Sequence, residues 1–442
     1  MKNILNRRQF VKNSLAGAAG LIAVPTVLPA SVVFGKNGVM PNDIINLGFI
    51  GVGRMGGGHL NSFLKFPDVR IVSICDVRKD RRDNAKQKVD SNYGDTRCAT
   101  YSDYRELLAR KDVDAIVTAS PDHWHALIGV EAAKQGKAMY FEKPLALTVD
   151  ECKILRKAIK NNSICFQHGT QQRSTREFRF TVEMVRNGKI GEIKRIVAEA
   201  TGCKTAPIPP TEPVPEGFDY EMWLGPAPLA PYCEQRCSIE FMNINDYSLG
   251  GLSGSWGVHH IDIVQLAMDA DNSGPVEVEG KGIRVTEGLF NNYNTYEVEY
   301  KYPNGVKLLY MDRQTVKAKI PQFQGQSSMA ILFEGTEGWI YVARGYLDAY
   351  PKSLLDTVIA DDEFKLPASD DHRRNFLDGM RKGSTPISTI ESAVKSEIVC
   401  QQAFISMEVG QKLHWDNEKE MFTNSDAANK MLSRPRRSPY NL

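Results

Sequence analysis

Three glycines near the start of the chain are spaced so that they could hold the phosphates of a dinucleotide. Gly51, Gly53 and Gly56 follow a short apolar run that resembles a buried strand. In a strand-to-helix turn, the first glycine permits the tight turn, the second lets the backbone approach a pyrophosphate, and the third lets the helix pack closely. The helix, expected to begin near Arg54, would direct its dipole and free N–H groups at the phosphates. The motif predicts a cofactor site that also includes Arg54 and Met55.

An acidic residue follows at the distance that such a site requires. The segment Val69–Cys75 has the β-branched content of a strand, and Asp76 comes directly after it, twenty residues beyond Gly56. A carboxylate there can bind the ribose hydroxyls of NAD and would repel the additional phosphate of NADP. Arg78 and Lys79 come next and could still accept that phosphate, and Asp76 could instead be a turn or capping residue. We expect NAD as the cofactor, with NADP as the alternative.

Strands and helices then alternate as far as residue 168. Apolar strand patterns at 113–120, 138–141 and 164–166 are separated by helical patterns at 126–135 and 149–160. This alternation is typical of a parallel sheet covered on both faces, in which ligands bind beyond the carboxyl ends of the strands. The cofactor-binding side chains expected on that rim, besides Asp76, are Ser120, Pro121, His125, Glu142 and Lys143.

Two residues could carry proton transfer. Hydride transfer between a nicotinamide and a carbinol requires a group that removes or supplies the hydroxyl proton. His259, expected at or just before the first turn of a helix, titrates near neutrality in its ordinary state. Lys143 would do so if it were desolvated or close to other cations. Each could instead be structural, His259 as a core histidine bonded to backbone and Lys143 as a residue at the end of a strand.

The segments that follow the alternating region differ in construction. Hairpin patterns at 294–312 and 330–343 predict an antiparallel sheet, and 370–410 is predicted to be helical from an aspartate cap. The expected fold class is therefore α/β, with a Rossmann domain at 43–168 followed by an α+β domain at 169–442.

The overall charge limits the kinds of partner. The 442 residues suffice for two or three domains, and the 55 basic and 53 acidic residues nearly cancel. This balance gives no electrostatic reason to expect nucleic acid or an anionic membrane as partner.

The N-terminal residues 1–36 are predicted to be a targeting segment. Arg7 and Arg8 precede an apolar stretch that Pro25 and Pro29 interrupt. Twin arginines before such a stretch are typical of Tat export, and the prolines argue against a stable membrane span. We expect a periplasmic enzyme exported in folded form; a soluble N-terminal arm is the alternative.

The eight cysteines show no framework spacing. Cys233 and Cys237 could close a small disulfide in an oxidising compartment, but the paired C-x-x-C motifs of a zinc site are missing. We expect mostly buried thiols and no metal site.

Four motifs together resemble the Gfo/Idh/MocA family, the relatives of glucose-fructose oxidoreductase and inositol dehydrogenase. They are Gly51-Val52-Gly53-Arg54-Met55-Gly56, Ser120-Pro121-Asp122-His123-Trp124-His125, Glu142-Lys143-Pro144 and Gly257-Val258-His259. The resemblance extends from Ile44 to the end of the chain. It implies that Lys143 is the catalytic or substrate-orienting group and His259 its proton-transfer partner. It also implies a large open sheet in the second domain, through which homodimers or homotetramers form.

One position departs from the family pattern. Many members carry an acid four residues before the histidine, where this chain has Ser255. A neutral serine cannot stabilise an imidazolium by charge, so we expect His259 to have a lower pKa or another partner.

The function that the resemblance implies is an NAD(P)-dependent oxidoreductase acting on a hydroxyl of a sugar, glycoside or polyol. Because free nicotinamide is scarce outside the cytoplasm, we expect a tightly held cofactor. Lys143 and His259 would hold the substrate hydroxyl. The weaker candidates for the sugar pocket are Gln171, Arg173, Trp256, His260 and Asp262.

Two other functions remain open. Exported members of the family include redox-elimination glycosidases such as α-N-acetylgalactosaminidases, although the intact Glu142-Lys143-Pro144 triplet weighs against that activity. The other is a non-catalytic protein that binds a dinucleotide or a sugar.

Overall fold

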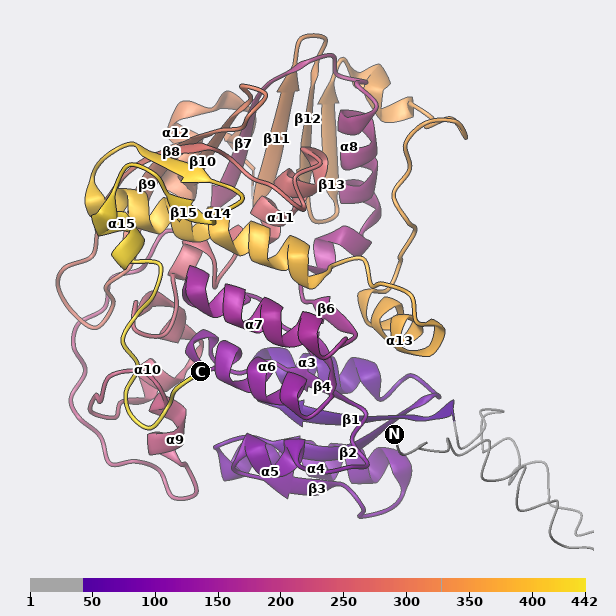
Figure 1. Cartoon of the computed structure of the whole chain (residues 1–442), viewed down its shortest axis with the longest axis vertical. Coiled ribbons are helices and arrows are strands. Elements are labelled where there is room, and N and C mark those ends of the chain that lie inside the picture. Colours follow the sequence, from indigo (N-terminus) through magenta and orange to yellow (C-terminus); the bar gives the residue numbers. More distant parts are fainter. Residues whose placement is uncertain (1–42, 327) are drawn as a thin grey trace, which may run out of the picture. The chain divides into compact units, whose positions relative to one another are not determined.

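Two β-sheets organise residues 45–442 of the computed structural model, which describes residues 43–326 and 328–442 (Figure 1). The predicted targeting segment, residues 1–36, lies outside the described residues. Both sheets belong to one unit of the chain, so the contacts between them lie within a single folded body.

The first sheet has six strands, all parallel, in the order β3-β2-β1-β4-β5-β6. The order reverses between β1 and β4, and ligands of open α/β sheets bind in the crevice at such a reversal. The strands are β1 (Ile45–Ile50), β2 (Val69–Cys75), β3 (Ala99–Tyr101), β4 (Ala115–Thr118), β5 (Ala138–Phe141) and β6 (Phe166–His168). The predicted Rossmann fold is confirmed.

Helices follow the strands of this sheet as the sequence pattern predicts. They are α3 (Arg54–Phe63), α4 (Lys79–Tyr93), α5 (Tyr104–Leu108), α6 (His125–Lys134) and α7 (Val149–Asn161). Helix α7 illustrates the local cause, because the Thr148 hydroxyl accepts a hydrogen bond from the N–H of Glu151 and two acids lie in the first turn. Its buried face carries Cys152, Leu155 and Ile159.

The second sheet has nine strands in the order β13-β12-β11-β7-β10-β9-β8-β14-β15. Only the pair β7 and β10 is parallel, so the sheet is mostly antiparallel, as predicted. The strands are β7 (Ile193–Ala200), β8 (Glu277–Arg284), β9 (Tyr293–Lys301), β10 (Lys307–Asp312), β11 (Ala330–Gly335), β12 (Trp339–Ala343), β13 (Tyr346–Tyr350), β14 (Leu413–Asp416) and β15 (Met421–Phe422).

Several helices cover one face of this second sheet, and one short helix covers part of the other. Ile196 and Ala198 of β7 belong to the main core, whereas Val197 packs in a separate cluster with residues of α12 (Arg313–Lys319). Alternate residues of a strand face opposite sides, so these two clusters lie on the two faces. On the main-core side lie α8 (Arg176–Arg186), α11 (Gly257–Ala267) and α14 (Ile390–Val409).

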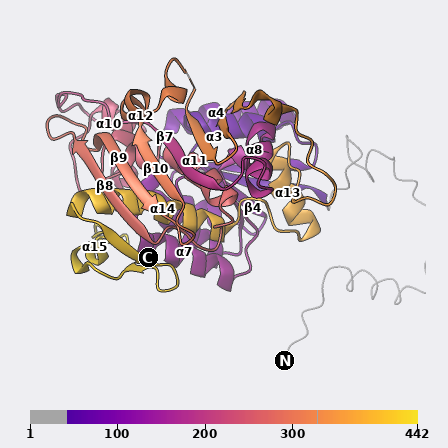
Figure 2. The same ribbon diagram turned by 90° about the horizontal axis from the view of Figure 1, so that it is seen from above.

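Helix α14 joins the two halves of the fold. It contacts β8 of the second sheet and α7 of the first domain, so it lies between them (Figures 1 and 2). Within the region 370–410, predicted to be helical, residues 372–382 and 390–409 are helical, and Gly383, with φ of +66°, ends α13 (His372–Lys382). The remaining short helices are α9 (Tyr220–Leu224), α10 (Glu234–Cys237) and α15 (Asp426–Lys430).

Candidate functional site

A cavity of about 550 Å³ lies along the carboxyl ends of the parallel strands. Residues that follow β1, β2, β4 and β5 line one part of it, among them Gly51, Asp76, Ser120 and Lys143. The segment Gly254-Ser255-Trp256, which precedes α11, lines the other part. The cavity therefore joins the rim of the Rossmann sheet to the second half of the fold.

The glycine-rich turn has the backbone geometry that its sequence predicts. Gly51 has φ of +79°, and a Cβ atom added to Gly56 would lie 1.9 Å from the carbonyl oxygen of Gly51. Gly53 precedes the first residue of α3, and no side chain caps the helix there. Gly53, Arg54 and Met55 all line the cavity, so the uncapped N–H groups of the first turn are available to an anion.

Asp76 lies where a ribose would bind. One carboxylate oxygen accepts a hydrogen bond from the N–H of Val52 at 2.9 Å, and the other accepts from the N–H of Arg78 at 2.9 Å. Burial raises the pKa of Asp76, and the two N–H groups and nearby arginines oppose that shift. Together with the uncapped helix start, this carboxylate fits a dinucleotide.

The cations that could accept the additional phosphate of NADP differ from those predicted. Arg78 pairs with Asp80 and Glu234, and Lys79 pairs with Asp83. Arg81 lines the cavity instead. Its Nη1 would lie 3.1 Å from a Cβ atom added to Gly53.

His125 has a different role from the predicted cofactor contact. It is fully buried, and its two ring nitrogens face the carbonyl oxygens of Ser120 at 2.9 Å and Pro144 at 2.5 Å. It does not line the cavity, whereas Ser120 and Pro121 do. His125 therefore fixes the loops after β4 and β5 relative to each other.

Glu142 lines the cavity as the centre of a buried hydrogen-bond network. Arg373 donates to Nδ1 of His59 at 3.0 Å, so Nε2 of His59 carries the hydrogen that it donates to Glu142 at 2.7 Å. Gln171 donates to the same carboxylate oxygen at 2.7 Å and does not line the cavity, contrary to its prediction as a substrate residue. Burial acts to raise the pKa of Glu142, but the bond from His59 and the charge of Lys143 lower it to about 2.

Lys143 connects the two parts of the cavity. Its Nζ donates to the carbonyl oxygens of Gly254 at 2.6 Å and Ser255 at 3.2 Å. An ammonium group has three hydrogens, so one remains for a ligand oxygen.

His259 is buried beside the cavity residue Trp256, with their ring centres 6.1 Å apart. Its side chain is 4% exposed, it is not among the lining residues, and its Nδ1 has no hydrogen-bond partner in the described part of the chain. Burial lowers its pKa well below the ordinary value, and the charges of Lys143 and Arg344 add to that shift. The pKa of His259 thus shifts in the direction expected from a neutral Ser255, but burial is its main cause.

Trp256 and His260 have separate roles. Trp256 lines the cavity, and its indole N–H donates to Nε2 of His260 at 2.8 Å. Nδ1 of His260 then donates to the carbonyl oxygen of Glu199 at 2.6 Å. His260 therefore anchors the indole and is not itself a cavity residue, contrary to prediction.

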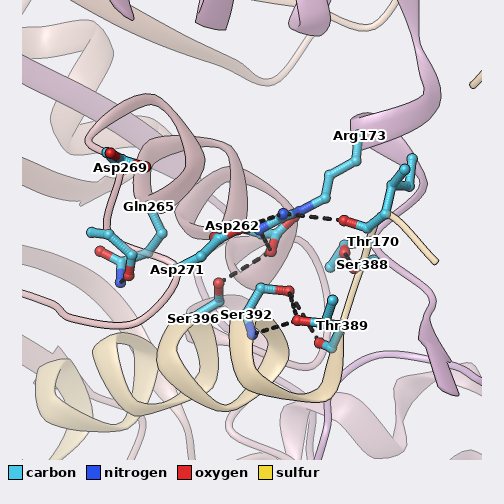
Figure 3. Close-up of polar contacts among 12 residues, drawn as sticks. Thr170, Arg173, Asp262, Gln265, Asp269, Asp271, Ser388, Thr389, Ser392 and Ser396 are labelled. Atoms are coloured by element: carbon cyan, nitrogen blue, oxygen red, sulfur yellow. Dashed lines mark hydrogen bonds and ion pairs between the residues drawn. The ribbon is translucent and has the colours of Figure 1, made fainter. Parts of the chain in front are cut away.

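Arg173 and Asp262, both predicted as weaker substrate residues, form an ion pair in the core (Figure 3). The guanidinium donates to the two oxygens of Asp262 at 2.7 and 2.8 Å and also pairs with Asp271. Ser396 of α14 donates to Asp262 at 3.1 Å. Neither predicted residue lines the cavity, because each satisfies the buried charge of the other.

Several cavity residues were missed by sequence reasoning. Asp122 and Trp124 lie in a recognised motif but were not assigned to the site, whereas Tyr104, Arg81 and Arg344 lie in no motif. All eight cysteines are free thiols and seven are buried, as predicted for most of them; Cys233 and Cys237 form no disulfide.

These features define an α/β protein with a dinucleotide site that opens toward a second, mixed-sheet domain. Two sequence families match it: "Oxidoreductase family, NAD-binding Rossmann fold" over residues 45–170, and "Oxidoreductase family, C-terminal alpha/beta domain" over residues 201–442. The chain belongs to the Gfo/Idh/MocA oxidoreductase family, and its N-terminal domain is an NAD-binding Rossmann domain.

Curated relatives match part of the chain. A glycosyl hydrolase family 109 protein of Shewanella pealeana is 33% identical over 204 residues, which are 43% of this chain and 44% of the relative. Another of that name, from Shewanella baltica, is 34% identical over 208 residues, 44% of this chain and 45% of the relative. The match thus spans less than half of the length of these relatives.

Solved structures share the fold over most of the chain. The WlbA dehydrogenase of Bordetella pertussis, in complex with NADH and UDP-GlcNAcA, superposes with a TM-score of 0.62 at 16% identity, covering 84% of this chain and 99% of that one. Myo-inositol 2-dehydrogenase of Lactobacillus plantarum gives a TM-score of 0.57 at 18% identity over 84% and 99%. Within residues 43–442, position 327 apart, no helix is long and apolar enough to cross a membrane.

Proposed function

We propose that this protein is an NAD(P)-dependent oxidoreductase that transfers hydride between the nicotinamide and a hydroxyl of a sugar, glycoside or polyol. The observation that carries the proposal is the single cavity lined both by the glycine-rich turn with Asp76 and by Lys143 with the segment before α11. A dinucleotide bound at the first group would supply the hydride acceptor or donor near the second.

Lys143 is the residue that we assign to the reacting hydroxyl. Its ammonium already donates to two carbonyl oxygens, and the third hydrogen can bind a substrate oxygen. Carried by the loop after β5 and bonded to the segment before α11, this cation orients the hydroxyl and stabilises negative charge that develops on its oxygen.

We propose His259 as the acceptor of the hydroxyl proton. Its ring is neutral at pH 7 because its pKa is lowered by burial and by Lys143, and its Nδ1 is unpaired among the described residues. Replacing His259 with Asn should lower turnover while the protein still retains its dinucleotide; unchanged turnover would contradict this assignment.

The direct test uses the cofactor that the protein holds. The purified protein is dialysed extensively, incubated with a panel of free sugars, glycosides and polyols, and denatured, and the released dinucleotide is identified by mass. Conversion of NAD to NADH by one compound is the expected result. Absence of any dinucleotide after dialysis would contradict a tightly held cofactor, and a dinucleotide whose redox state never changes would contradict net oxidation.

The names of the curated relatives favour a second candidate, a redox-elimination glycosidase of the α-N-acetylgalactosaminidase kind. In that activity the net reaction is cleavage of a glycosidic bond, and the cofactor ends in its starting redox state. Release of an aglycone from a chromogenic glycoside without net NADH formation would favour this candidate over the first.

We also propose a periplasmic location and a homodimer or homotetramer. The support for export is the Arg7-Arg8 pair before the interrupted apolar stretch. Cell fractionation with and without an Arg7→Lys, Arg8→Lys double change tests the location, and light scattering of the purified protein tests the assembly.

A further inference from the structure

Arg344 is a cation of the cavity that none of the sequence motifs contains. It lies with Gly345 in the turn between β12 and β13 and lines the cavity together with Trp256 and Lys143. The N–H of Gly345 donates to a carboxylate oxygen of Glu177 at 2.9 Å, which fixes the turn.

The guanidinium of Arg344 has a built position. Its Cζ lies 4.5 Å from the centre of the Trp256 ring, a cation–π contact. The indole itself is held, because it donates to His260, which in turn donates to the backbone of Glu199. A guanidinium stacked by one face keeps its N–H edge free for a planar oxyanion, which it can bind through two parallel hydrogen bonds.

No carboxylate neutralises Arg344 within the described residues. It takes part in no ion pair, and no hydrogen bond of its guanidinium is present there. Glu142 and Glu177 are the acidic groups whose charge acts on it, yet neither lies within ion-pair distance. Glu142 is instead bonded to His59 and Gln171, and Glu177 to the Gly345 N–H.

The other cations of the cavity have other partners, either bonded groups or expected phosphates. Arg54 and Arg81 lie beside the glycine-rich turn, where the phosphates of a dinucleotide are expected. Lys143 is bonded to two carbonyl oxygens. Arg344, an exposed residue, therefore carries a charge that only solvent balances, at the end of the cavity that we assign to the substrate.

We infer that the substrate carries an oxyanion, a carboxylate, sulfate or phosphate on a sugar ring, and that Arg344 binds this group while Lys143 binds the reacting hydroxyl. The inference rests on the proposed function, because it assigns the class of substrate for the same cavity. A neutral sugar would leave the exposed charge of Arg344 to water alone.

The test compares matched pairs of sugars in the NAD-loaded full-length protein. The pairs are glucuronate with glucose, galacturonate with galactose, and galactose 6-sulfate and galactose 6-phosphate with galactose. For the wild type, kcat/KM should be higher for the charged member of at least one pair and should fall with added salt. The sulfate, phosphate and carboxylate arms show which oxyanion is preferred.

Variants then assign the preference to Arg344. Arg344→Gln should reduce the charged-to-neutral ratio of kcat/KM by about 10- to 100-fold, the effect of losing a charge-assisted hydrogen bond. Arg344→Lys keeps the charge but not the paired N–H donors of the guanidinium, so its charged-to-neutral ratio should lie between those of the wild type and Arg344→Gln. Arg97→Gln, at a residue whose side chain is 74% exposed and outside the cavity, is the matched control and should leave the ratio unchanged.

Two results would overturn the inference. One is a ratio that Arg344→Gln does not change; the other is an equal loss for charged and neutral sugars, which would place Arg344 on the cofactor or in the fold. If no sugar reduces the cofactor, calorimetric titration with the same pairs of sugars measures whether the protein binds the charged member. Binding of the charged member that depends on Arg344 supports the inference although the proposed function fails, and no binding of any charged sugar overturns it.

Discussion

The two ends of the cavity are built in different ways. At the cofactor end, Gly51, Gly53, Gly56 and Asp76 come from neighbouring strands and turns, in the order in which the chain passes them. At the other end, the lining residues come from remote segments, among them the loop after β5, the segment before α11 and the turn after β12, and residues within the stretch 222–242 also line the cavity. The first end is defined by local backbone geometry, whereas the second depends on how distant segments pack.

This difference determines which substitutions leave dinucleotide binding intact. A Cβ at Gly56 would meet a carbonyl oxygen at 1.9 Å, so the cofactor end is fixed by backbone contacts. The substrate end is fixed by hydrogen bonds from side chains across the cavity, such as those from Lys143 to the carbonyl oxygens before α11. Substitutions at that end should therefore change reactivity and specificity without removing the dinucleotide.

Lys143→Met gives the largest expected effect and tests this separation directly. It removes the cation that we assign to the reacting hydroxyl, and loss of such a group should lower kcat/KM by about 10²- to 10⁴-fold. The released dinucleotide, measured by mass after denaturation, should remain close to the wild-type amount. Lys134→Met, at an exposed residue of α6, is the control. Equal loss of dinucleotide and turnover would show that the two ends are not separable.

Asp262→Asn should instead act on stability. The change leaves Arg173 buried with its charge only partly compensated by Asp271, and breaking a buried pair costs about 3–5 kcal/mol. Denaturant unfolding should show this loss, while KM of the folded fraction stays unchanged because neither residue lines the cavity. A change in KM without a loss of stability would show that Arg173 and Asp262 contribute to substrate binding.

Glu397 makes the stability of the substrate end depend on pH. Its carboxylate accepts hydrogen bonds from the Ser253 hydroxyl and, at 3.3 Å, from the N–H of Leu145, so it supports the segment that holds Lys143. Burial raises its pKa to about 7. The folded state therefore binds this proton more tightly than the unfolded state, and the stabilisation is complete below the ordinary pKa and is lost as pH rises through 7.

The measurement is the free energy of unfolding from pH 4 to pH 8 for the wild type and Glu397→Gln. The wild type should lose up to about 3 kcal/mol relative to the variant over this interval, at 1.36 kcal/mol for each pKa unit. Parallel curves for the two proteins would show that Glu397 does not titrate in this range.

Asp76→Asn gives the smallest effect, at the cofactor end. The amide keeps one acceptor oxygen where the carboxylate uses two, and its charge is gone. Affinity for NAD should fall by about 10- to 100-fold, the cost of one charge-assisted hydrogen bond, and the preference for NAD over NADP should narrow. Fluorescence titration with both reduced cofactors checks this, and an unchanged preference would favour the turn or capping role for Asp76.

The same contrast explains which features the sequence could predict. The parallel sheet, the antiparallel hairpins and the glycine-rich turn follow from local periodicity and spacing, and the structure confirms them. Gln171, Arg173, His260 and Asp262 were predicted for the sugar pocket because they are polar, yet each is bonded to a partner in the core. Only the three-dimensional packing shows where each polar side chain finds its partner.

Arg344 is the opposite case. It lies in a tight turn with no motif around it, and its place in the cavity depends on the pairing of β12 with β13 and on the position of Trp256. His59 and Arg373, which hold Glu142, likewise come from helices far apart in the chain. Spacing along the sequence carries no information on such contacts.

A crystal structure of the protein with NAD tests the central claim, that one cavity joins the cofactor and the reacting hydroxyl, most directly. The pyrophosphate is expected at the N–H groups that begin α3, the ribose on Asp76 and the nicotinamide beside Lys143, facing the segment before α11. A dinucleotide whose nicotinamide points away from Lys143, or one bound outside this cavity, would contradict it.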